Sequence, residues 1–209
     1  MNWIVNFLCG LPAIILAIGV HEYAHAKVAD SLGDNTPRLM GRVTLDPFVH
    51  IDILGLVCLA VMGFGWGKPV RTNPGNFKNP RRGSMLVALA GPLSNLCLAL
   101  IFQVVLILFY RFAPANVTVF NVTESILTPF VTWNILLFAF NLFPVPPLDG
   151  YHVLEGILGA RAPRFRRFMK QYGIGVLILL SLLGVTGFFI SIISGILQLP
   201  MLTLANLIL

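Results

Sequence analysis

The sequence predicts an all-α polytopic membrane protein, and this prediction rests on its composition, its apolar runs and the positions of its basic residues. Of its 209 residues, 57% are hydrophobic and 11% are charged, and the mean hydropathy is +0.87. A soluble domain of this size needs more polar surface. A bilayer crossing takes about 20 apolar residues, and the charge-free stretches of that length are residues 1–20, 85–109, 126–148 and 173–209. They predict about four transmembrane helices.

The net charge of +6 comes largely from two loops beside these apolar stretches. Basic residues in short loops next to membrane helices are typical of the cytoplasmic side, so both loops are predicted to be cytoplasmic. This distribution does not indicate a nucleic-acid partner. The basic residues are Lys68, Arg71, Lys78, Arg81 and Arg82 in the first loop, and Arg161, Arg164, Arg166, Arg167 and Lys170 in the second.

Two shorter features are predicted between the first two apolar stretches. Residues 34–47 combine turn-forming residues with a short β-branched stretch, which predicts a surface β-hairpin. Residues 48–67 form a short, glycine-interrupted apolar run, which predicts a re-entrant segment and leaves a full crossing as the alternative. The whole of 1–209 is interpreted as one membrane domain, with a core at about 10–155 and a C-terminal transmembrane helix at about 173–199.

The most informative motif is His21-Glu22-Tyr23-Ala24-His25, at the end of the first apolar run. Two histidines four residues apart project from one face of a helix, one turn from each other. Two such imidazoles can share a zinc ion, and the glutamate between them can hold and deprotonate a zinc-bound water. The alternative is a pair of buried or interfacial histidines without a metal.

A third protein ligand is needed to complete a catalytic zinc site. A metzincin would continue with glycine and histidine where this chain has Val28 and Ser31, and no glutamate of the gluzincin kind occurs between Glu22 and Glu124. Asp149 is the leading candidate, because it ends a charge-free membrane segment where a carboxylate is costly without a cation. The alternative for Asp149 is a turn residue in a Pro-Pro-Leu-Asp-Gly loop.

Topology links this ligand set to the re-entrant segment. The basic loops place Asp149 at the cytoplasmic end of its segment, and the histidines reach the same depth only if residues 48–67 turn back. The zinc hypothesis therefore predicts that the first helix runs parallel to the helix before Asp149. Pro144, Pro146 and Pro147 are expected to end that helix.

Other polar residues have competing interpretations. Asn95 and Asn141 are candidates for binding substrate backbone or an oxyanion, and interhelical hydrogen bonding is the equal alternative. Structural or surface roles are expected for three further polar residues, because the ligand set is already complete without them. They are His50, Asp52 and His152.

Three motifs together resemble the site-2 protease family of intramembrane zinc metalloproteases. They are HEYAH in the first helix, Gly91-Pro92-x-x-Asn95 in a later one, and the Asn-Leu-Phe-Pro-Val-Pro-Pro-Leu-Asp-Gly stretch that ends at Gly150. The resemblance covers about residues 10–155 and is greatest to small prokaryotic members without a PDZ or CBS domain. It implies Zn²⁺ bound by His21, His25 and Asp149, with Glu22 as the catalytic base.

The resemblance also implies hydrolysis of peptide bonds in membrane-embedded protein substrates. The expected location is the bilayer of a prokaryotic plasma membrane, with the active site towards the cytoplasm. Two alternative functions are a metal-binding transport protein and a catalytically inactive membrane scaffold. The nearly apolar outer halves of the segments argue against the transporter, and Glu22 argues against the scaffold.

Overall fold

Three long helices form the centre of the molecule. The computed structural model describes residues 3–62, 65–112 and 116–208. Helices α1 (Trp3–Ser31), α4 (Pro80–Arg111) and α5 (Val117–Asn141) pack against one another in all three pairs. All three are long and apolar enough to cross a membrane, and a bent helix pair near the C-terminus raises the number of candidate crossings to four. The prediction of an all-α membrane protein is confirmed.

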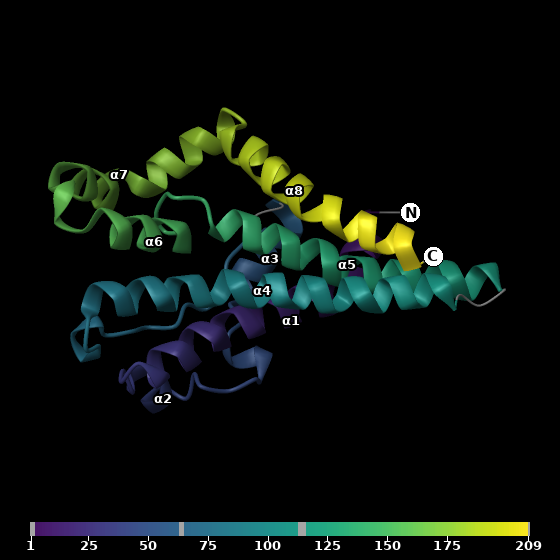
Figure 1. The fold of residues 1–209 in the computed structure, drawn as a ribbon, viewed down its shortest axis with the longest axis horizontal. Coiled ribbons are helices and arrows are strands. Elements are labelled where there is room, and N and C mark those ends of the chain that lie inside the picture. The colour runs from purple at the N-terminus through teal and green to yellow at the C-terminus, as the bar shows by residue number, and fades with distance from the viewer. Residues whose placement is uncertain (1–2, 63–64, 113–115, 209) are drawn as a thin grey trace.

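The direction of the helices follows from their connections. Figure 1 shows α4 starting at the end of the molecule where α2, α6 and the start of α7 also lie, and finishing at the opposite end, where α5 begins. Helix α1 runs in the same direction as α5, and α4 runs against both. This is the parallel arrangement that the zinc hypothesis requires of α1 and α5.

The predicted β-hairpin at residues 34–47 is wrong. The described residues contain no strand, and their β-pairing is limited to an isolated antiparallel bridge between Ile51 and Gly67. The segment instead contains the short helix α2 (Thr36–Leu39), followed by the 3-10 helix η1 (Pro47–Val49).

Local side-chain hydrogen bonds explain this difference. Asp34 Oδ1 accepts the backbone N–H of Thr36 at 3.1 Å, and Asp46 Oδ1 accepts that of Phe48 at 3.0 Å. Each bond satisfies a donor that a strand would give to a neighbouring strand, so the aspartates favour helical turns. The guanidinium of Arg38 also binds both carboxylate oxygens of Asp30, which holds α2 against the end of α1.

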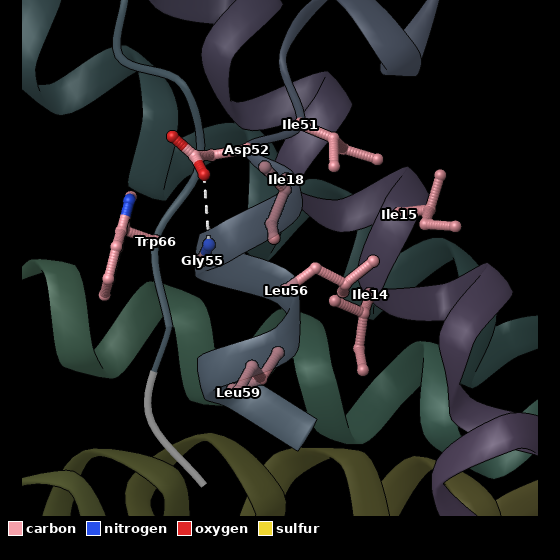
Figure 2. A pocket seen from close by; sticks show the side chains of 9 residues that line it. All are labelled: Ile14, Ile15, Ile18, Ile51, Asp52, Gly55, Leu56, Leu59 and Trp66. Atoms are coloured by element: carbon pink, nitrogen blue, oxygen red, sulfur yellow. Dashed lines mark hydrogen bonds between the residues drawn. The ribbon is translucent and has the colours of Figure 1, made fainter. Parts of the chain in front are cut away.

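Helix α3 (Ile53–Met62) is too short to cross a membrane. Its ten residues span about 15 Å, against about 30 Å for the hydrocarbon core. Figure 2 shows Leu56 and Leu59 of α3 facing isoleucines of α1, while Trp66 lies on the other side of α3. Asp52 Oδ1 accepts the N–H of Gly55 in the first turn of α3. The bridge between Ile51 and Gly67 brings the two ends of this segment together, as expected for a segment that turns back.

Glycine at position 55 permits this return. A Cβ atom there would collide with the backbone of Trp66, so a larger residue would push the returning chain away from α3. Beyond Trp66, the chain is extended as far as the 3-10 helix η2 (Pro74–Asn76), and α4 begins a few residues later.

The C-terminal part is bent. Helix α6 (Asp149–Leu158) is followed by the 3-10 helix η3 (Gly159–Arg161), α7 (Pro163–Leu182) and α8 (Val185–Ile208). Helices α7 and α8 meet at 74°, so one continuous helix over about 173–199 is not observed. Gly184 has a φ of 76°, which most side chains disfavour, and it stands at this break. Helix α8 packs on α5 and α4.

Candidate metal centre

His21 and His25 lie one turn apart in the final third of α1, and both side chains are buried. Each imidazole uses its Nδ1 atom in a hydrogen bond of 2.7 Å, His21 with Asn95 Oδ1 and His25 with the carbonyl oxygen of Val87. Both partners are acceptors on α4, so each Nδ1 carries the proton. The Nε2 atom of each neutral ring is therefore a free lone pair.

Two further hydrogen bonds, both donated by Nδ2, fix the orientation of the Asn95 side chain. Its Nδ2 atom donates to the carbonyl oxygen of Ala17 at 3.0 Å and to Asn134 Oδ1 at 2.9 Å, so Oδ1 is the atom that faces His21. Asn134, on α5, is fully buried and donates to the carbonyl oxygen of Phe130 in its own helix. These contacts occupy both donors of Asn95 and favour interhelical hydrogen bonding over direct contact with substrate.

Asp149 reaches the histidines from the proline-rich turn after α5. Helix α5 ends at Asn141, as the prolines predict, and Asp149 is the first residue of α6. A Cβ atom at Gly150 would collide with the carbonyl of Leu142, so glycine lets the turn fold tightly behind Asp149. The cluster of Phe143, Val145, Leu148 and Leu177 packs this turn against α7.

Three acceptor atoms converge at this point. His21 Nε2 and His25 Nε2 lie 3.0 Å apart, and Asp149 Oδ2 lies 3.1 Å from the first and 3.2 Å from the second. Asp149 Oδ2 is buried and has no hydrogen-bond partner among the described residues. Two imidazole lone pairs and a carboxylate repel one another unless a cation lies between them.

The donor set and its spacing fit zinc. Two histidines and one carboxylate are the three protein ligands of a known class of catalytic zinc site, which leaves a fourth position for water or substrate. Ligand bonds of about 2.0–2.1 Å separate tetrahedral ligands by roughly 3.3 Å, close to the three distances here. His21, His25 and Asp149 form the one group of this kind among the described residues.

Gly91 provides the space for the imidazoles. A Cβ atom at this position of α4 would lie 2.5 Å from His25 Cε1 and 2.6 Å from His21 Cε1, well inside van der Waals contact. The glycine of the Gly91-Pro92-x-x-Asn95 motif thus allows close contact between α4 and the histidines, and Asn95 orients one of them.

Glu22 lies beside the cluster and is partly buried. Its Oε2 atom accepts the backbone N–H of Val70 at 3.1 Å. Val70 belongs to the extended stretch that follows the bridge at Gly67, and the N–H of Lys68 in the same stretch donates to the carbonyl oxygen of His50 at 2.7 Å. The carboxylate of Glu22 is therefore held by non-helical chain, whereas the histidine Nδ1 atoms bond to α4.

Asp34 anchors the other end of this extended stretch. It is fully buried and accepts hydrogen bonds from Thr36, from the backbone N–H of Asn73 at 2.6 Å, and from Asn76 Nδ2 at 2.8 Å. Burial alone raises the pKa of Asp34, but these hydrogen bonds outweigh burial, so the pKa lies below its ordinary value. Asp34 therefore stays ionised at neutral pH.

The other predicted polar residues lie outside the ligand cluster. Asn141 Nδ2 donates to the carbonyl oxygen of Leu137 in its own helix. His50 is buried and bonds through Nε2 to the carbonyl oxygen of Thr44, and the His152 side chain is 53% exposed. Asn134 and Asp34 were missed by the sequence interpretation, although an asparagine inside an apolar helix, as at Asn134, was a usable signal.

The fold and this site together define a class: a helical membrane protein in which two histidines and one carboxylate converge in an arrangement that could hold a metal ion. Comparison of the sequence with known proteins leads to the same class. The sequence model of peptidase family M50 matches residues 110–183, which include Asp149. The chain is 38% identical over 170 residues to "Putative zinc metalloprotease YwhC" of Bacillus subtilis (strain 168), covering 80% of this chain and 77% of that protein.

Two mycobacterial proteins, both named "Putative zinc metalloprotease Rip2", are also similar. The protein from Mycolicibacterium smegmatis is 28% identical over 185 residues, covering 86% of this chain and 69% of that one. The protein from Mycobacterium tuberculosis H37Rv is 30% identical over 186 residues, covering 84% and 67%. No solved structure matches the chain.

The chain belongs to peptidase family M50. This confirms the resemblance to the site-2 proteases and identifies the protein as a zinc metalloprotease.

Proposed function

We propose that this protein hydrolyses peptide bonds of membrane-embedded substrates at a zinc site formed by His21, His25 and Asp149, with Glu22 as general base. The observation that carries the proposal is the convergence of three buried acceptor atoms within 3.0–3.2 Å, beside a glutamate from the same helical turn. Zinc bound there supplies Lewis acidity, which polarises a peptide carbonyl and lowers the pKa of water towards about 7.

The side chains have distinct roles in this mechanism. Glu22 takes a proton from the attacking water and passes it to the leaving amine, as a general base and then a general acid. Asn95 keeps His21 in the tautomer that presents Nε2 to the metal, and the Val87 carbonyl does the same for His25. Asn141 remains the candidate for contact with the substrate, because its Oδ1 atom is not used in its hydrogen bond to Leu137.

The extended stretch beyond Gly67 supports a mode of substrate binding. A helical substrate hides its carbonyls in hydrogen bonds and must become extended before it can be cut. The stretch is itself extended and lies against Glu22 through the N–H of Val70. We expect a substrate to add to it as a further strand, held by main-chain hydrogen bonds close to the base.

The topology supports a cytoplasmic active site in a prokaryotic plasma membrane. The start of α4, next to the first basic loop, lies at the same end of the molecule as α6 and the start of α7, which carries the second. Basic residues of this kind remain on the cytoplasmic side. The histidines and Asp149 lie in the segments that lead to this end, and similar proteins occur in bacteria.

Glu22→Gln tests the proposal most directly. Cleavage of a single-span membrane substrate should fall by about 10²–10⁴-fold, the usual contribution of general acid–base catalysis, while the zinc content of the purified protein stays at one per chain. Equal cleavage by wild type and variant would exclude Glu22 as the base. A wild-type protein purified under metal-retaining conditions without zinc would overturn the zinc site.

A further inference from the structure

A cavity with several charged and polar side chains in its lining lies at the first turns of α4, away from the proposed metal ligands. Its volume is about 480 Å³, and it is bounded by the first turns of α4, by α6 and by the start of α7. Its polar lining comes from Arg81 and Ser84 on α4, His152 and Glu155 on α6, and Arg166 on α7. The mechanism proposed above uses none of these side chains.

The balance of charge around the cavity is positive. Glu155 is the one acidic residue in its lining, and it is already paired with Lys170 at 3.2 Å and approached by Arg166 at 4.0 Å. With one carboxylate against Arg81, Arg166 and Lys170, two positive charges remain uncompensated. An anion in the cavity would therefore be attracted.

The two arginines that line the cavity have N–H groups without a hydrogen-bond acceptor among the described residues. The Nε atom of Arg166 is buried and has no hydrogen-bond partner within the described part of the chain. Arg81 donates to the carbonyl oxygens of Gly156 and Ile157 at the end of α6, which fixes its guanidinium at the cavity wall and leaves other N–H groups unused. A planar guanidinium held in this way suits the oxygens of a phosphate group.

The surroundings indicate where such a phosphate comes from. The cavity adjoins both basic loops, so in the topology proposed above it lies at the level of the phospholipid headgroups of the cytoplasmic leaflet. Ile157 on α6, next to the lining residue Gly156, is an exposed apolar side chain that an acyl chain can cover. We propose that the cavity binds the phosphate of an anionic phospholipid headgroup.

Titration of short-chain phosphatidylglycerol into the detergent-solubilised protein tests this, with phosphatidylcholine and inorganic phosphate as separate arms. Phosphatidylglycerol should raise the Tm by about 5–10 °C at saturation, and phosphatidylcholine should raise it by much less. Equal protection by both lipids would overturn the proposal. Protection by inorganic phosphate at the same concentrations would retain the phosphate site and overturn the lipid as its source.

Matched variants test whether phosphatidylglycerol binds in the cavity or on the basic surface around it. Arg166→Gln should weaken phosphatidylglycerol binding by about 10–100-fold through loss of a charge-assisted hydrogen bond, and Ser84→Ala should weaken it less. Arg167→Gln removes the same charge from the next, exposed position of α7 and should bind like wild type. Equal losses in Arg166→Gln and Arg167→Gln would show attraction to a general basic surface and overturn the cavity as the site. Unchanged binding in both Arg166→Gln and Ser84→Ala would also overturn it.

Discussion

The two sides of the metal centre are held in different ways. On one side, the imidazoles are fixed by buried hydrogen bonds that they donate to Asn95 Oδ1 and to the Val87 carbonyl on α4. On the other, Glu22 is held by the backbone of an extended stretch that is anchored at Asp34. Helices that pack along their length resist displacement, whereas a non-helical stretch held by a few hydrogen bonds opens more easily. This contrast suits the proposed mechanism, in which the metal ligands need a rigid support and the proposed base Glu22 lies next to the stretch that we expect substrate to join.

Loss of a ligand should have the largest effect on the rigid side. Asp149→Ala is expected to reduce bound zinc below about one tenth per chain and to abolish cleavage, because one of three protein ligands is lost. Zinc content by mass spectrometry and cleavage in membranes check this. His152→Ala, on the same helix but more than half exposed, is the control and should retain zinc. Full zinc content in Asp149→Ala would remove Asp149 from the ligand set.

The next largest effect is expected at the contact between α4 and the histidines. Gly91→Ala places a methyl group among atoms of both imidazoles, so the rings or α4 must move and the ligand geometry is lost. We expect zinc affinity to fall by about 100-fold or more. Competition with a chelator measures this. Gly187→Ala, where an added Cβ meets nothing within 4 Å, should bind zinc like wild type.

A smaller loss of zinc affinity is expected at Asn134, which contacts the proposed ligand His21 only through Asn95. Asn134→Leu removes the acceptor for one N–H of Asn95 and leaves that buried donor unpaired, at a cost of about 1–3 kcal/mol. Zinc affinity should fall by about 10-fold, since groups that support metal ligands typically contribute 10–100-fold. The same chelator assay applies. Thr132→Ala, on an exposed face of α5, is the control, and an equal loss there would indicate a general effect on α5.

The side that holds the base should respond in catalysis and not in metal binding. Asp34→Asn retains the shape but weakens the hydrogen bonds to Asn73 and Asn76, so kcat/KM is expected to fall by about 10-fold at full zinc content. A fall in zinc content to match would contradict the division between the two sides.

Low pH should weaken the hydrogen bonds by which Asp34 holds the extended stretch. Because the pKa of Asp34 is lower in the folded protein than its ordinary value, its contribution to stability is present above about pH 4 and is lost as the pH falls through the folded pKa. Hydrogen exchange of the Asn73 amide should therefore lose protection in acid in the wild type. The Asp34→Asn variant should show weaker protection with little dependence on pH over that range.

The sequence predicted what local patterns and burial costs determine. His21 and His25 lie on one helix face because they are four positions apart, and Asp149 was proposed as their partner because a carboxylate at a membrane segment is costly without a cation. The parallel course of α1 and α5 was predicted from the zinc hypothesis and the positions of the basic loops, and the structure has it. These features depend on short stretches of sequence and on the membrane, so no tertiary contact was needed to infer them.

The missed features depend on contacts between distant residues. Asp34 bonds to residues about 40 positions away, and no local pattern distinguishes it from a turn residue. The β-hairpin was wrong because side-chain hydrogen bonds from Asp34 and Asp46 favour helical turns over strand pairing. Gly184 was a usable sign of the break between α7 and α8, but apolar helices often contain glycine, so its meaning depends on the packing of α8.

Helix α4 contributes to the position of all three proposed ligands. Asn95 and the carbonyl of Val87 hold the histidines, while Arg81, at the start of the same helix, binds the carbonyls at the end of α6, the helix that begins with Asp149. A displacement of α4 along its axis would therefore shift the histidine supports and the aspartate support together. The geometry of the proposed metal centre thus depends on the axial position of a single helix, whose first turns also border the cavity lined by Arg81 and Arg166.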